Sequence, residues 1–129
     1  MKGVPRDLKY TKEHEWVRVR GQEAEVGITD FAQGELGDVV FVELPQVGAQ
    51  LKQTKSFGTI DAVKTVSDLF APVSGEVAAI NTELKGNPAL INQSPYEKGW
   101  MVRIKIQNPA EMDALLSAEA YEKALGAHA

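Results

Sequence analysis

The stretch IDAVKTVSD, residues 60–68, places one lysine between two runs of strand-forming residues. The charged residues nearest to Lys64 are the acids Asp61 and Asp68, and no second amine is close to it in the sequence. A tight hairpin here would make the lysine project from its tip. Most lysines are solvated surface residues, but an isolated primary amine on a hairpin tip is also a group that an enzyme can acylate.

Strand-forming runs continue on both sides of this hairpin. Polar and apolar residues alternate on either side of Gly21, which predicts a hairpin over 14–28. β-Branched and aromatic residues predict a strand over 39–44 that Pro45 ends. Similar runs predict further strands at 55–63, 66–71, 75–80 and 100–106. The chain is therefore expected to be mainly β.

Short helices with recognisable ends separate and follow these strands. Thr29 is placed to cap a helix that Gly37 ends, and Asn81 to cap one or two helical turns before residue 93. Near the C-terminus, Asn108 with Glu111 three residues later resembles a capping box, and Ser117 begins a second helical segment. Helices at the end of a strand-rich chain predict a β sandwich or barrel with a helical appendix.

Composition excludes several classes of function. The 129 residues carry a net charge of −4 with an isoelectric point of about 5.2, and Lys and Arg form no run, which argues against nucleic acid. No apolar stretch is long enough for a membrane span. The chain has no cysteine, and His14 and His128 are its only histidines, so we expect neither a metal site nor catalytic residues. The N-terminus resembles no targeting peptide, which favours the bacterial cytoplasm, or the mitochondrial matrix for a trimmed eukaryotic form.

Five stretches together resemble a known family. They are TIDAVKTVSDLFAPVSGEV (59–77), HEWVRV (14–19), VGITDFAQGELGDVVFVELPQVG (26–48), INQSPYEKGWMVRIKI (91–106) and LLSAEAYEKAL (115–125). In this order, and over nearly the whole chain, the sequence resembles the H-protein family of the glycine cleavage system. The resemblance implies one domain over 1–129, a hybrid barrel-sandwich of antiparallel strands. It also implies a lipoyl hairpin at about 55–77, short helices, and a C-terminal helical segment at about 109–125.

The resemblance further implies a carrier protein and not an enzyme. Lipoate would be joined as an amide to Lys64, and the arm would carry an aminomethyl group between partner enzymes. Those partners would be a pyridoxal-phosphate glycine decarboxylase, a tetrahydrofolate-dependent aminomethyltransferase, a flavin (FAD) dihydrolipoyl dehydrogenase and a lipoate-attaching enzyme. The carrier is expected to act as a monomer, with the cofactor supplying the chemistry.

Other residues take roles from the same resemblance. Gly48 and Gly75 lie sixteen positions before and eleven after the lysine, as in lipoyl carriers, where such glycines allow the turns that set how the hairpin projects. Asp61 stands where the family usually has Glu and is associated with the attaching enzyme. Glu15, with Asp68 as a second candidate, would dock the loaded arm, since a carboxylate can hold a cationic amine.

One segment near the expected docking cleft lacks a histidine that some family members have. Some members have a histidine in the segment after ITD, where this chain has Phe31 and Glu35, so no role for such a histidine carries over.

His14 is expected to be a hydrogen-bonded structural residue. Large aromatic side chains dominate protein cores, so we expect core positions for Trp16, Phe41, Phe57 and Trp100.

Two alternatives to the glycine cleavage carrier stay open. The chain could be an H-like relay that passes its lipoyl group to other carriers, because a relay needs the same hairpin and arm. It could also be a lipoyl or biotinyl module of another complex. Biotin modules usually have Met on both sides of the lysine, whereas Val63 and Thr65 stand here. A module of a 2-oxoacid dehydrogenase would be shorter and part of a multidomain chain.

Overall fold

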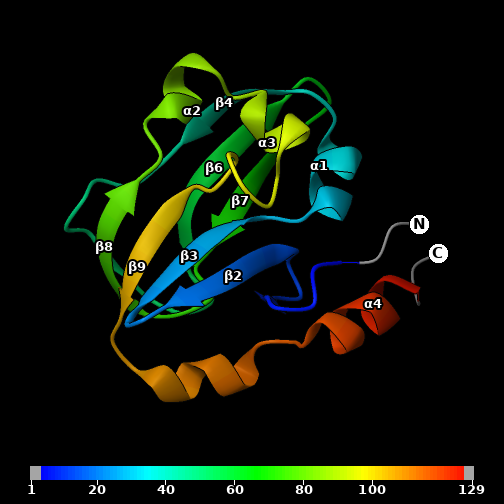
Figure 1. The fold of residues 1–129 in the computed structure, drawn as a ribbon. Coiled ribbons are helices and arrows are strands. Elements are labelled where there is room, and N and C mark those ends of the chain that lie inside the picture. Colours follow the sequence, from blue (N-terminus) through cyan, green and yellow to red (C-terminus); the bar gives the residue numbers. More distant parts are fainter. Residues whose placement is uncertain (1–3, 127–129) are drawn as a thin grey trace.

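A computed structural model describes residues 4–126, whose strands form two antiparallel sheets (Figure 1). Six strands pair in the order β1-β2-β3-β9-β8-β5, and the other three in the order β4-β6-β7. The strands are β1 Lys9–Tyr10, β2 Glu15–Arg20, β3 Glu23–Ile28, β4 Val39–Glu43, β5 Gln50–Leu51, β6 Ser56–Ala62, β7 Val66–Phe70, β8 Gly75–Ile80 and β9 Val102–Ile106. The prediction of a mainly β fold of antiparallel strands is confirmed. The short strands β1 and β5 were not expected from the sequence.

The helices follow the expected cap signals with two exceptions, at Asn81 and at Glu111. The helices are α1 Asp30–Leu36, α2 Glu83–Gly86, α3 Leu90–Gln93, the 3-10 helix η1 Pro109–Ala114 and α4 Ala118–Gly126. The side chains of Thr29, Asn108 and Ser117 accept hydrogen bonds from the backbone N–H groups of Ala32, Ala110 and Ala120, respectively. The residue that directly precedes α2 is Thr82, while Asn81 accepts a hydrogen bond from the Glu83 backbone N–H. Glu111 does not complete a capping box; its carboxylate instead accepts from the backbone N–H and the hydroxyl of Ser74. None of the helices described is long and apolar enough to cross a bilayer.

The lysine hairpin consists of β6 and β7, with Asp61 opposite Val66 at its closed end. It is shorter than the expected range of 55–77, because the chain leaves the three-stranded sheet after Phe70 and joins the other sheet as β8 at Gly75. Pro72 lies in this crossover, where a residue without a backbone N–H costs no sheet hydrogen bond. The expected range therefore begins just before a strand of one sheet and ends within a strand of the other.

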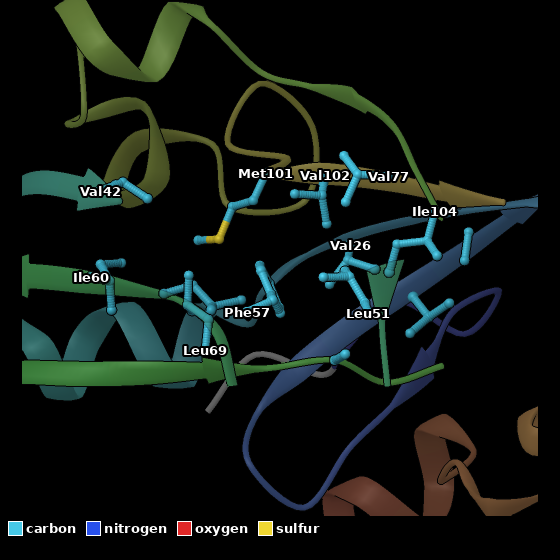
Figure 2. Packing of buried hydrophobic residues seen from close by; sticks show 14 of the residues in the cluster. Val26, Val42, Leu51, Phe57, Ile60, Leu69, Val77, Met101, Val102 and Ile104 are labelled. Atoms are coloured by element: carbon cyan, nitrogen blue, oxygen red, sulfur yellow. The ribbon is translucent and has the colours of Figure 1, made fainter. Parts of the chain in front are cut away.

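The main core fills the space between the two sheets, and its side chains point toward one another (Figure 2). Trp16 and Phe57 are buried as expected, and Trp100 is half-buried. The prediction for Phe41 is wrong, because its side chain is 54% exposed. A bulge between Val39 and Phe41 shifts the pairing of β4 with β6. One extra residue reverses the alternation of a strand, so Phe41 lies on the outward face.

A second core cluster joins the N-terminal segment to α4. The rings of Tyr10 and Tyr121 stack with 4.7 Å between their centroids. The Tyr121 hydroxyl lies 2.8 Å from both His14 Nδ1 and Thr29 Oγ1, which confirms His14 as a hydrogen-bonded residue of the framework. Helix α4 thereby fixes the start of β2 and the end of β3, and Glu15 lies at that point.

Candidate functional site

Lys64 lies exposed at the turn between β6 and β7. The backbone N–H of Ala62 donates to the carbonyl of Thr65 at 2.8 Å, which closes the turn. The N–H of Val63 donates to the carbonyl of Asp38 at 2.9 Å and ties the tip to the segment after α1. None of the ion pairs in the described part of the chain involves Lys64. The tip is thus held by backbone bonds while the amine stays accessible.

The aliphatic part of the Lys64 side chain lies against Gly37. A Cβ added to Gly37 would be 3.3 Å from Lys64 Cε, and the φ of +80° is one that favours glycine. Asn92 of α3 holds this turn, since its Nδ2 donates to the Gly37 carbonyl at 2.9 Å and its Oδ1 accepts from the Val39 N–H at 2.9 Å. The sequence identified Gly37 only as the end of a helix, and it gave no sign of Asn92.

A cleft of about 280 Å³ lies between α1 and the lysine hairpin. Helix α1 contributes Phe31 and Glu35, the start of β2 contributes Glu15, and β7 contributes Asp68 and Leu69. The two carboxylates assigned to docking therefore line the same cavity. The segment in which some relatives carry a histidine also lines it.

Glu15 is the buried charge-bearing group of this cleft, with 2% of its surface exposed. Its Oε1 accepts from the Thr11 hydroxyl at 2.5 Å, and its Oε2 accepts from the Phe70 backbone N–H at 3.2 Å. Burial raises the pKa of Glu15 to about 7, although both hydrogen bonds act to lower it. The carboxyl is therefore poised between its neutral and charged forms near neutral pH, and a cation entering the cleft would favour the charged form. Neither Thr11 nor Phe70 was identified from the sequence.

A second cavity, of about 350 Å³, lies beside the first and shares Glu15 with it. Its lining includes Gln53, Pro72 and Leu115. The Gln53 side-chain amide donates to the carbonyls of Pro72 and Glu111, so its amide hydrogens already have protein acceptors. The carboxyl of Glu15 thus lies between two hollows, which the sequence did not indicate.

The remaining acid, Asp61, lies outside the cleft. It pairs with Phe41 on β4 and with Val66 on β7, and these three residues form a row across the three-stranded sheet. Because Phe41 and Val66 are exposed and cross-strand partners share a face, Asp61 belongs to the outward face of the hairpin. A protein that approaches Lys64 from outside would therefore meet Asp61.

The two glycines at carrier spacing lie away from the hairpin turn. Gly75 is the first residue of β8 and pairs with Leu51 and Ile106. A Cβ on Gly75 would collide with the Lys105 carbonyl oxygen. Gly48 has a φ of +94°, and its N–H donates to the carbonyl of Val77 at 2.8 Å. Both glycines serve the β5–β8–β9 edge of the six-stranded sheet, so their link to the projection of the hairpin is indirect.

No group of three or more metal-binding side chains is found within residues 4–126. His128 lies outside the described residues.

Comparison with known proteins supports the family resemblance over most of the chain. The profile of the family described as glycine cleavage H-protein matches residues 8–128. A glycine cleavage system H protein of Symbiobacterium thermophilum is 59% identical over 122 residues, which are 95% of each chain. One of Anoxybacillus flavithermus is 57% identical over 93% of this chain and 94% of its own. The crystal structure of a glycine cleavage system H protein from Mycobacterium marinum superposes with a TM-score of 0.88 at 39% identity, covering 95% of this chain and 99% of that one.

Proposed function

The chain belongs to the glycine cleavage H-protein family and is the lipoyl carrier of that system, not a catalytic enzyme, and from this premise we propose that Lys64 is its attachment residue. The observation that carries the proposal is the accessible amine on a hairpin tip tied by backbone hydrogen bonds to Thr65 and Asp38. Proteins of this family carry lipoate. An amide to Lys64 Nζ would place the arm beside the cleft that contains Glu15.

The residues around Lys64 fit an acyl arm. Gly37 leaves room for the methylene groups of the lysine, and the cleft beside the hairpin combines the apolar Phe31 and Leu69 with the carboxyl of Glu15. An apolar chain ending in a polar group suits such a lining. When bound, lipoate would supply a dithiolane that opens on loading, so that one of its sulfurs could carry the aminomethyl group before the resulting dithiol is reoxidised. The protein would place and shelter it.

Glu15 would distinguish a cationic load from an uncharged arm. An amine that enters the cleft as a cation forms a charge-assisted hydrogen bond with an ionised carboxylate. Because the pKa of Glu15 is raised to about 7 by burial, its charge is costly in the empty cleft and is favoured by the cation. The load can shift the equilibrium between the docked and the undocked arm only if it interacts more favourably with one of these two conformations than with the other. Asp68 lines the same cavity but is exposed, so we assign it a smaller role than Glu15 in holding the cationic load.

As a member of the family, the protein works with the other components of the glycine cleavage system. The specific partners that we propose are glycine decarboxylase, the tetrahydrofolate-dependent aminomethyltransferase, dihydrolipoyl dehydrogenase and a lipoate-attaching enzyme. We also propose that the whole chain is one domain, that it acts as a monomer and that it resides in the cytoplasm. The bacterial origin of the similar proteins supports the last point. A role as lipoate relay would use the same residues.

Intact mass and peptide mapping test the attachment residue. The parent protein, produced together with a lipoate–protein ligase and lipoate, should gain one lipoyl group, and the modified peptide should contain Lys64. Lys64→Arg keeps the charge but presents a guanidinium, which is a poor acyl acceptor, so this variant should fold and remain unmodified. A lipoyl group on Lys55, Lys85 or Lys98 would contradict the assignment.

A further inference from the structure

Exposed apolar side chains gather around the proposed attachment residue. Val40, Phe41, Val63 and Val66 are 54–72% exposed, and we call these four residues the tip patch. In the described part of the chain, the other large hydrophobic side chains with comparable exposure are Val19 and Val47. Scattered exposed valines need no explanation, but apolar residues gathered at one place mark a candidate interaction surface.

The register of the three-stranded sheet brings the tip patch together. Phe41 and Val66 lie on either side of Asp61, each as its direct cross-strand partner. Val63 is the residue before Lys64, and its hydrogen bond to Asp38 holds it close to the start of β4. The bulge in β4 leaves both Val40 and Phe41 exposed. Regular alternation from Val39 would bury Phe41 but would also turn Val42 outward and Glu43 inward. The bulge keeps Val42 in the core and leaves Phe41 on the surface.

The charged residues near the tip patch are acidic except for Lys64 itself. Asp61 lies within the row of Phe41 and Val66, and Asp38 bonds to Val63 through its backbone. Two residues further along β6, Glu43 and Asp68 lie on either side of Thr59. A partner that covers this surface therefore needs an apolar centre and basic residues around it, because complementary charge favours encounter and fixes orientation.

We infer that the tip patch is the docking surface for the enzyme that attaches the acyl group to Lys64, an inference that rests on the proposed function. Attachment takes place at Nζ of Lys64, which loses a proton and forms an amide with the carboxyl carbon while AMP leaves the activated acid. That enzyme must enclose the lysine, so the residues beside Lys64 have to lie at the mouth of its active site. Enzymes that act on the sulfurs at the far end of the arm do not need to enclose Lys64 itself.

Steady-state lipoylation of the apo-protein by a lipoate–protein ligase, with lipoate and ATP, tests the inference. The matched pair is Val63→Ser and Val47→Ser, the same change at two exposed valines, one beside Lys64 and one in the loop after β4. We expect Phe41→Ser to raise KM for the carrier about tenfold, as a lost interface anchor does, and Val63→Ser to raise it severalfold. Val47→Ser should leave KM unchanged, and kcat should stay close to the parent value in all three.

Charge and specificity supply two further readouts. KM of the parent should rise with salt, and it should rise less in Asp61→Asn, because one screened attraction is missing. After prolonged incubation has lipoylated the Phe41→Ser protein and a phosphine has reduced the disulfide of its arm, dihydrolipoyl dehydrogenase with NAD should reoxidise the arm at the parent rate. A slower reoxidation would show that the tip patch serves the arm-using enzymes as well, and would overturn the assignment to the attaching enzyme.

Other outcomes would also overturn it. Equal KM values for Phe41→Ser and Val47→Ser would do so, as would a fall in kcat at constant KM, which would indicate a shifted lysine. Sedimentation of the apo-protein checks for a second copy of this chain as the occupant; a parent dimer that Phe41→Ser dissociates would make the tip patch a self-association surface. If the parent itself gains no lipoyl group at Lys64, the proposed function fails together with the inference, whereas the preceding outcomes leave the proposed function intact.

Discussion

Replacing Glu15 by glutamine tests whether the cleft holds a proton near neutral pH. The substitution keeps size and shape while removing the ionisable group. A glutamine oxygen can accept from the Phe70 N–H. Thr11 Oγ1 already accepts from the backbone N–H groups of Glu13 and Glu15, so a glutamine amide facing it loses the hydrogen bond that Thr11 now donates to the carboxyl. Any fixed cost of this exchange is the same at every pH, and the pH-dependent part of the stability then reports the titration.

The expected magnitude follows from the pKa of Glu15, which burial raises from 4.5 to about 7 in the folded protein. The folded state therefore binds this proton more tightly than the unfolded chain does. Stability that comes from the neutral carboxyl is fully present below the unfolded pKa, and it is lost as the pH rises to the folded pKa. Each pKa unit corresponds to about 1.4 kcal/mol, so the parent should lose about 2.5 kcal/mol between pH 5 and pH 8 through this group alone.

Urea unfolding of both proteins at pH 5 and pH 8 measures this term. The free energy of unfolding of the parent, relative to Glu15→Gln, should fall by about 2–3 kcal/mol from the lower to the higher pH. Contributions that are the same in the two proteins cancel in the comparison. Glu43→Gln, which changes an exposed carboxyl, serves as the control. If the parent and Glu15→Gln change by the same amount between the two pH values, Glu15 does not hold its proton in the folded state.

Two glycine substitutions distinguish an effect on the surroundings of Lys64 from an effect on the stability of the fold. Gly37→Ala forces an unfavourable φ of +80° on alanine and crowds the methylene groups of Lys64. It should lower the free energy of unfolding, measured in urea, by about 1–2 kcal/mol and should slow lipoylation by lowering kcat. An unchanged kcat would show that Gly37 is not needed to make room for the Lys64 side chain. Gly75→Val places a side chain against the Lys105 carbonyl in the six-stranded sheet and should destabilise the whole domain by about 3 kcal/mol or more. A Gly75→Val protein with the thermal midpoint of the parent but slow lipoylation would instead support a direct effect on the hairpin.

Short-range patterns in the sequence determined most of the secondary structure. The alternation around Gly21, the strand formers on both sides of Lys64 and the cap residues Thr29 and Asn108 act on their own neighbours. Such signals are visible in a single chain because a turn or a cap involves only a few consecutive residues. The accessible lysine belongs to this group, since its place between two strands of one hairpin needs no distant contact.

Contacts between distant segments decided what lies around that lysine. The Phe70 N–H meets Glu15 across 55 positions of sequence, and Tyr121 meets His14 across 107; burial raises the pKa of Glu15 only once these segments have assembled. Phe41 looks like a core residue by composition and is exposed because a bulge reverses its strand. Pairing register and burial depend on the packing of both sheets, which no local pattern encodes. For this reason the sequence determined the carrier hairpin, and only the tertiary structure decided the charge state of its cleft and the apolar surface at its tip.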